Sequence, residues 1–272
     1  MKIDFIKSLF TRFNENFDRI IGGGVIRKAV YLGDIIYCFI MHGSSLRDYF
    51  DYEFYKKRNY EKKQFVTWRR AQNYFKVLQN NTYVHKLNDK AEIYKNFSKY
   101  LGRKWIYIKN CSFEQFEIFC RKHRILIVKP HCSSLGRGVK KVIVNHQTNL
   151  REWYLDLIEE DVVLEEYLVQ HCEMSAFHPE SVNTVRVTSV LTDDGVKIMN
   201  AAFRMGNKGS VVDNHGAGGI AAAIDINSGT VMTTGVDKYQ NRYIKHPITG
   251  KMIVGFQIPF WDEVIKLVME VL

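Results

Sequence analysis

One lysine stands at the end of an apolar run and is followed by a loop of small residues. The run covers residues 125–129 and ends at Lys129, and the loop contains Ser133, Ser134, Gly136 and Gly138. A lysine ammonium meets phosphate oxygens as a point charge, and glycines let backbone N–H groups approach an anion closely. This pattern predicts a strand and a loop that hold the phosphates of a nucleoside triphosphate.

A second motif follows in residues 162–168, where an apolar run leads into the acidic pair Glu165 and Glu166 and then Leu168. A carboxylate at this place could accept a hydrogen bond from the amino group of adenine. The solvated end of a strand is the alternative for this pair. The order and spacing of the two motifs favour a nucleotide-binding enzyme.

The hydrophobic pattern divides the chain near residue 85. Apolar residues at helical spacing predict an amphipathic helix in residues 1–21, which packs on the protein or rests on a membrane surface as a peripheral contact. The apolar stretch 25–41 carries three charges and predicts a buried helix. We therefore expect a helical N-terminal region over residues 1–85.

Strands and helices are mixed beyond that point. Alternation and turn residues predict strands at 105–108, 125–129, 139–144, 162–168, 184–191, 196–204 and 219–225. Helical spacing predicts helices at 113–119, 150–158 and 260–272. The fold class expected from this order is α+β, in a domain covering residues 86–272.

Charge and cysteine content restrict the class of protein. Residues 1–110 hold 22 Lys and Arg against 10 Asp and Glu, whereas residues 111–272 are close to neutral. Basic and aromatic residues alternate in 52–60 and 68–74, which fits a solvated helical face, a surface for anionic sugar phosphates or lipid, or a nucleic-acid surface. An odd number of scattered cysteines, with a charged N-terminus, favours reduced thiols and a cytoplasmic protein.

Several strings resemble the ATP-grasp superfamily. Asp89-Lys90, residues 127–130 with the glycine loop, and residues 164–168 resemble its nucleotide half. The strings SVNTVRV, from Ser181, and DNHGAGGI, from Asp213, are similar to its sugar-transfer-associated branch. The resemblance covers residues 30–272 and implies two α+β lobes that sandwich ATP, a nucleotide lobe at about 100–168 and a second lobe at about 169–272.

The resemblance also implies roles for individual residues. Lys90 and Lys129 neutralise the phosphates, the 133–138 loop closes over them, and Glu165, Glu166 and Leu168 border the adenine. Arg186 and Arg204 suit the transferring phosphoryl group because guanidinium groups pair with its oxygens bidentately. Asn183 and Asn214 position substrate or phosphate. As structural alternatives, Lys90 is a surface charge and the two arginines form ion pairs with Asp213 or Asp225.

The metal ligands of the fold are the point at which this sequence departs from the pattern. The resemblance implies ATP and Mg²⁺ as cofactors, with acidic and asparagine ligands on late strands, and no Glu-x-Asn follows Asp225. We expect those ligands beyond residue 272, in a chain truncated at its C-terminus. A hard cation needs several oxygen ligands, so catalysis by this 272-residue form is doubtful.

The resulting prediction is an ATP-dependent carboxylate–amine ligase with a small-molecule or sugar-linked substrate, acting in the biosynthesis of cell-surface polysaccharide. The alternative is a non-catalytic nucleotide- or glycan-binding module that partners a glycosyltransferase. A nucleic-acid-binding protein ranks third, and no nucleic-acid partner is expected.

Overall fold

A computed structural model describes residues 13–14, 17–18, 21–22, 24–78, 89–133, 136 and 138–271. The chain divides into two compact units, Met1–Asn81 and Thr82–Leu272. Most of the helix predicted at 1–21, the boundary predicted near residue 85 and Ser134 lie outside the described residues.

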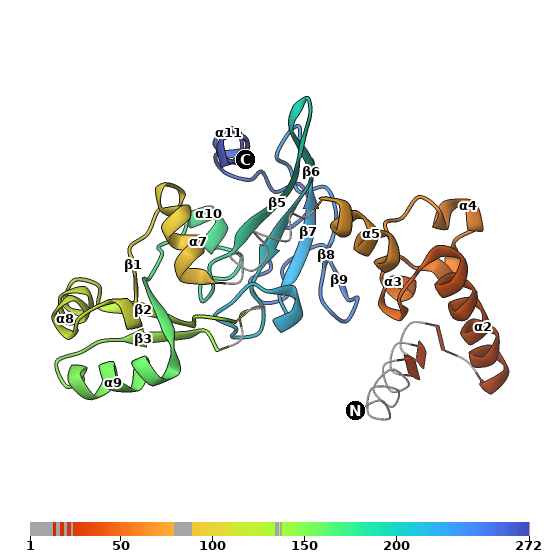
Figure 1. The fold of residues 1–272 in the computed structure, drawn as a ribbon. Coiled ribbons are helices and arrows are strands. Elements are labelled where there is room, and N and C mark those ends of the chain that lie inside the picture. The colour runs from red at the N-terminus through yellow and green to blue at the C-terminus, as the bar shows by residue number, and fades with distance from the viewer. Residues whose placement is uncertain are drawn as a thin grey trace. The chain divides into compact units, whose positions relative to one another are not determined.

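The first unit is helical (Figure 1). Its described elements are α2 (Val25–His42), α3 (Leu46–Asp51), a 3-10 turn (Phe54–Lys56), α4 (Asn59–Lys62) and α5 (Trp68–Leu78). Its core is largely aromatic, with Phe17, Tyr49 and Phe54 fully buried. Ser45 starts α3 through a capping box with Asp48, which satisfies two backbone N–H groups that a helix start leaves unpaired.

Helix α2 ends where residues from α5 reach its last carbonyl groups. Gly43 adopts a left-handed conformation with φ of 65°, and a Cβ there would lie 2.5 Å from the Arg69 side chain. The Arg69 guanidinium donates to the carbonyl oxygens of Phe39 and Ile40 at 3.0 and 3.2 Å. A glycine is therefore required at this helix end.

The burial predicted for the 25–41 stretch is wrong, although the helix itself is present. Of the α2 residues only Cys38 and His42 are buried, and Val25 and Ile26 are each 84% exposed. The inward face instead carries Asp34, which accepts hydrogen bonds from Lys62 and Tyr49. An apolar run predicts burial on all sides. In this helix, however, the one acidic residue, Asp34, points inward.

The second unit begins with α7 (Lys90–Asn96) and contains a four-stranded antiparallel sheet in the order β1-β4-β2-β3. The strands are β1 (Trp105–Tyr107), β2 (Ile125–Pro130), β3 (Lys140–Ile143) and β4 (Val162–Glu166). Strand β3 is the hairpin partner of β2, with Ile127 opposite Lys141. Helices α8 (Phe113–Lys122) and α9 (Leu150–Glu160) lie on one side of this sheet (Figure 1).

Alternation along the strands separates a core face from a polar face. Leu126, Val128 and Leu164 point into the core formed with α8 and α9. Ile127, Lys129 and Glu165 occupy the other face, because they lie at the intervening positions. The register places Glu165 opposite Ile127, one step diagonally from Lys129.

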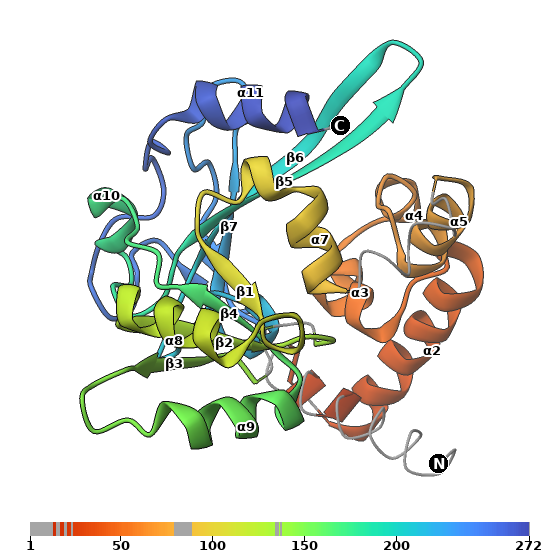
Figure 2. The same ribbon diagram turned by 60° about the vertical axis from the view of Figure 1, so that its left-hand side comes forward.

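A five-stranded antiparallel sheet follows in the order β5-β6-β7-β8-β9 (Figure 1), and Figure 2 shows β5 and β6 as its hairpin. Its strands are β5 (Thr184–Thr192), β6 (Gly195–Met205), β7 (Ile220–Ile224), β8 (Gly235–Val236) and β9 (Arg242–Tyr243). The short helix α10 (Cys172–Ser175) precedes the sheet, a 3-10 turn (His215–Ala217) precedes β7, and α11 (Trp261–Val271) follows it.

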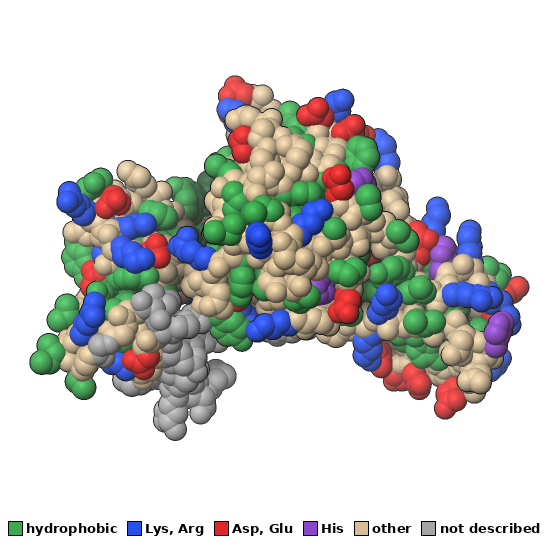
Figure 3. All heavy atoms as spheres, turned by 180° about the vertical axis from the view of Figure 1, so that it is seen from behind, with side chains coloured by type: hydrophobic (Ala, Val, Ile, Leu, Met, Phe, Trp, Pro, Cys, Tyr) green, Lys and Arg blue, Asp and Glu red, His purple; other side chains and the backbone are tan. Residues whose placement is uncertain are grey.

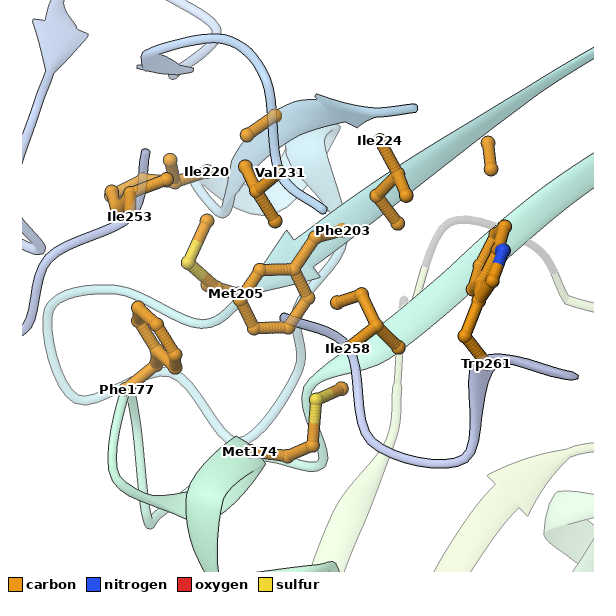
Figure 4. Close-up of a cluster of buried hydrophobic side chains, with 12 residues drawn as sticks. Met174, Phe177, Phe203, Met205, Ile220, Ile224, Val231, Ile253, Ile258 and Trp261 are labelled. Atoms are coloured by element: carbon orange, nitrogen blue, oxygen red, sulfur yellow. The ribbon is translucent and has the colours of Figure 1, made fainter. Parts of the chain in front are cut away.

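One face of this sheet is covered by a second hydrophobic core. Phe203, Met205, Ile220 and Ile224 from the strands meet Phe177 and Trp261 in this cluster (Figure 4). The alternate positions Thr184, Arg186 and Arg204 therefore share the opposite face, where Thr184 is paired with Arg204 across β5 and β6.

None of the helices described is long and apolar enough to cross a membrane.

Candidate functional site

A cleft of about 370 Å³ lies in the second unit, and its wall comes from both sheets. Strands β2 and β4 contribute one side, and the start of β5 with the segment before β7 contributes another. Of the residues predicted for the site, the wall contains Lys90, Lys129, Ser133, Gly136, Glu165, Glu166, Leu168 and Asn214. Two motifs that are remote in sequence thus meet at one cavity.

Lys129 and Glu165 form the charged centre of the wall. The Lys129 ammonium lies 2.7 and 2.8 Å from the two carboxylate oxygens of Glu165, whose side chain is almost fully buried. Burial lowers the pKa of Lys129, while the neighbouring Glu165 carboxylate acts in the opposite direction. The ion pair with Glu165 therefore stabilises a charged Lys129 at the cleft surface, where burial alone would disfavour the charge.

Two further groups hold the Glu165 carboxylate. The Tyr94 hydroxyl donates to it, and burial, reinforced by Glu165, raises the pKa of Tyr94 to about 12. The Arg103 Nε lies 2.7 Å from Oε2, without the alignment of a hydrogen bond. Since these donors and Lys129 surround the carboxylate, its side chain organises the cleft wall, and its contact with an adenine amino group stays a prediction.

Lys90 lies where α7 meets the end of β2. Its ammonium donates to the carbonyl oxygens of Pro130 at 2.7 Å and His131 at 3.0 Å, and to that of Ser133. An ammonium has three N–H donors, so these contacts use all of them. Burial lowers the pKa of Lys90. The structure therefore shows Lys90 fixing the start of the loop, and its phosphate contact stays a prediction.

The acidic pair is split between two environments. Unlike Glu165, Glu166 directs its carboxylate to the Lys104 N–H at 2.8 Å and to His123 at 3.0 Å. Leu168, which follows β4, lines the cleft. Tyr167 lies beneath the Lys141 ammonium, 4.0 Å from its ring centre. The segment after β4 thus presents backbone and ring edges to the cavity.

The glycine loop is shaped by two left-handed residues. Gly136 and Gly138 have φ of 74° and 73°, a region that favours glycine. A Cβ at Gly136 would lie 2.6 Å from Oδ1 of Asn214, and one at Gly138 would lie 2.7 Å from Pro130. The loop therefore approaches the DNHGAGGI segment closely, and larger residues would prevent this.

Arg204 forms the ion pair that the sequence left as an alternative. Its guanidinium lies 2.9 Å from Oδ1 of Asp213, and the Thr184 hydroxyl donates to Oδ2. Burial raises the pKa of Asp213, against the lowering influence of Thr184 and Arg204. Thr184 and Asp213 line the cleft, while Arg204 stands behind them. A contact of Arg204 with a ligand therefore stays a prediction.

Four of the described residues that were predicted for the site are not part of the cleft wall, namely Gly138, Asn183, Arg186 and Arg204. Asn183 is buried, and its amide donates to Gln170, Met174 and His178 and accepts from the Gly206 N–H. These bonds occupy the amide and indicate a structural role. Arg186 is exposed on β5, on the same face of the sheet as Arg204.

Sequence reasoning missed Arg103, Lys141 and Asp213 as cleft residues. Asp213 was considered only as an ion-pair partner, although it opens the distinctive DNHGAGGI string. Lys141 lies opposite Ile127 on β3, so the hairpin prediction together with strand alternation could have placed it on the cleft face. No signal of this kind marks Arg103, which precedes β1 in an irregular segment.

A pair of glycines tests the packing beside Asp213. A Cβ at Gly219 would overlap the backbone of Asp213 and approach the Met205 carbonyl at 2.9 Å, whereas nothing lies within 4 Å of one at Gly216. We expect Gly219→Ala to lower the free energy of unfolding by about 1–3 kcal/mol, as overpacking does. Gly216→Ala should leave it nearly unchanged. Urea titrations of both variants check this, and equal losses would contradict it.

Comparison with known protein families shows to which family the chain belongs. The profile of the family described as sugar-transfer associated ATP-grasp matches residues 69–272, so the chain belongs to that family. The family and the α+β fold class predicted from the sequence are confirmed. Comparison with curated proteins gives no match.

The cleft offers oxygen donors that suit magnesium only in part. Proteins of this fold bind ATP with Mg²⁺, and such an ion takes one or two carboxylates together with phosphate oxygens and water. Asp213, Asn214 and Glu180 supply oxygens in the wall, but Asp213 is already paired with Arg204. No group of three or more metal-ligating acidic, histidine or cysteine residues occurs among the described residues. The set fits an ion held mainly by the nucleotide.

Proposed function

We propose that this cleft binds ATP and that the protein activates a carboxylate for transfer to an amine-bearing acceptor, in the biosynthesis of a cell-surface polysaccharide. One observation carries the proposal. Lys129, the glycine loop and the segment that ends at Leu168 converge on a single cavity, in a chain of the sugar-transfer associated ATP-grasp family. A cation, a glycine loop and apolar residues in one cavity suit a nucleotide.

The chemistry follows from the charges in the wall. A substrate carboxylate oxygen attacks the γ-phosphorus of ATP, the bond to the β-phosphate oxygen breaks, and ADP leaves. The amine then attacks the acyl carbon, inorganic phosphate leaves, and the nitrogen loses a proton. Lys129 would offset phosphate charge in the first step, and Arg204 would stabilise the oxyanion that forms in the second. Asp213 and Asn214 would help to hold Mg²⁺, which would offset phosphate charge when bound.

A second candidate is a non-catalytic module that binds a nucleotide or glycan beside a glycosyltransferase. It is favoured by the pairing of Asp213 with Arg204 and Thr184, which occupies a buried acid of the cleft wall. Such a module would bind ATP without turning it over.

Release of ADP separates the two candidates. The protein with Mg²⁺-ATP is incubated with a panel of amino acids and sugar nucleotides, singly and in pairs. The ligase is expected to release ADP over many turnovers only when both a carboxylate and an amine acceptor are present, because the amine is needed to discharge the acyl-phosphate. ATP binding by calorimetry without ADP release across the panel would favour the binding module, and absence of binding would overturn both.

A further inference from the structure

Helix α2 presents an apolar face to solvent along its whole length. Ile26 and Val30 lie one helical turn apart, as do Ile36 and Ile40, and these four side chains are 84%, 67%, 52% and 61% exposed. Val25, Phe39 and Met41 extend the same surface. A contiguous apolar surface of this kind marks a site where another surface binds, since soluble proteins rarely leave one uncovered. We call the seven residues the α2 face.

The charge around this face is positive. Residues 24–78 contain eleven lysines and arginines against five acidic residues. Every one of the five acids is engaged within the helical unit: Asp34 with Lys62, Asp48 with the Ser45 and Trp68 N–H groups, Asp51 with Arg47, Glu53 with Lys56, and Glu61 with the Arg58 N–H. These acidic residues therefore do little to offset the positive charge of the remaining lysines and arginines in residues 24–78.

Basic side chains lie next to the α2 face itself. Arg27 is exposed within the helix, beside Ile26, and its guanidinium lies 5.9 Å from the Tyr31 ring. At the other end Arg69 lies 5.2 Å from the Phe39 ring. Figure 3 shows apolar side chains in green and basic ones in blue on the same surface of the helical unit, at the left.

We propose that the α2 face binds the surface of an anionic phospholipid membrane. An amphipathic helix lies in the plane of the interface when its apolar side chains reach the acyl region and its basic ones meet lipid phosphates. The 18 residues of α2 span about 27 Å, and the helix does not meet the requirement for crossing a bilayer. This proposal does not depend on the proposed function.

Other occupants fit the same surface less well. A second copy of the chain would place two sets of uncompensated basic groups against each other. Nucleic acid binds through basic and aromatic side chains, and the aliphatic residues that dominate the α2 face offer its phosphates nothing. Lipid is the partner that satisfies both the aliphatic residues and the positive charge.

Flotation of the full chain with vesicles tests the proposal. Vesicles of phosphatidylcholine alone are compared with vesicles containing about a third phosphatidylglycerol. We expect binding to the anionic vesicles that is at least tenfold tighter and that weakens with added salt. Arg27→Gln should weaken it about fivefold, the usual contribution of one basic residue near an anionic surface.

Two double variants separate the contribution of apolar side-chain insertion to vesicle binding from the contribution of charge. Ile26→Glu/Val30→Glu and the uncharged Ile26→Ser/Val30→Ser should each lose at least tenfold in binding, with unchanged thermal midpoints because both residues are exposed. Met199→Glu alters an apolar residue on β6 that is also exposed, at 61%, and is the control, which should bind vesicles like the wild type.

Each remaining outcome overturns the proposal. Wild-type protein that does not float with anionic vesicles would remove the membrane role. So would a dimer in sedimentation that the double variants convert to monomer, or RNA binding that the double variants abolish. ATP protection against unfolding is measured in parallel, so that failure of the nucleotide site is recognised separately.

Discussion

Lys129→Ala should abolish the protection that ATP gives against thermal unfolding. The ammonium is a partly buried cation of the cleft wall, and a phosphate would lose its charge partner. The substitution should also lower the free energy of unfolding by roughly 3–5 kcal/mol, because the buried Glu165 carboxylate would lose its main counter-ion. The shift in melting temperature with added Mg²⁺-ATP measures the first effect, and urea titration measures the second.

Two comparisons keep these effects apart. Lys140→Ala removes an exposed lysine from β3 that pairs with Glu160 at the surface, and it should change neither quantity measurably. Lys129→Met/Glu165→Gln removes both charges of the buried pair, so it should recover much of the lost stability without recovering ATP protection. A folded Lys129→Ala protein that ATP stabilises as well as wild type would contradict the role of Lys129.

The strands and helices of the second unit were predictable from sequence because their patterns depend on local sequence alone. The run 125–129 and its partner 139–144 flank a glycine loop, and the structure pairs β2 and β3 as the pattern predicts. The mixed α+β class follows from the order of such elements. Helix α2 shows the limit, since the apolar stretch indicated a helix but could not tell which side would be covered.

The residues that line the cleft were predictable only in part. The motifs indicated which segments of the chain meet there, but not which side-chain atoms contact one another. The contacts of Lys90 with three carbonyl groups depend on how α7 lies over the end of β2, which no spacing in the sequence encodes. The approach of Asn214 to Gly136 joins segments far apart in the chain. Individual roles in nucleotide binding remain predictions.

Asn183→Ala and Asn214→Ala should have opposite consequences. Asn183 lies outside the cleft wall with its amide fully bonded, so its loss leaves buried groups such as the Gly206 N–H without a partner. We expect the free energy of unfolding to fall by roughly 3 kcal/mol, while the folded protein keeps its ATP affinity. Asn214 lines the cleft, and no hydrogen bond joins its side chain to another described residue. Its removal should leave stability nearly unchanged.

Asn214→Ala should instead weaken ATP binding or slow ADP release, by about tenfold, the effect of one lost hydrogen bond to a charged group. Urea titration gives the stability of each variant, and calorimetry gives its ATP affinity. We expect Asn183→Ala to be less stable but to bind ATP normally, and Asn214→Ala to be stable but impaired in ATP binding. If Asn183→Ala weakens ATP binding at a temperature where it is fully folded, the ligand-positioning role predicted from the SVNTVRV string is restored. If Asn214→Ala behaves as wild type in both measurements, the approach of the DNHGAGGI segment to the glycine loop has no part in nucleotide binding, and only β2, β4 and the loop between β2 and β3 remain as candidates for it.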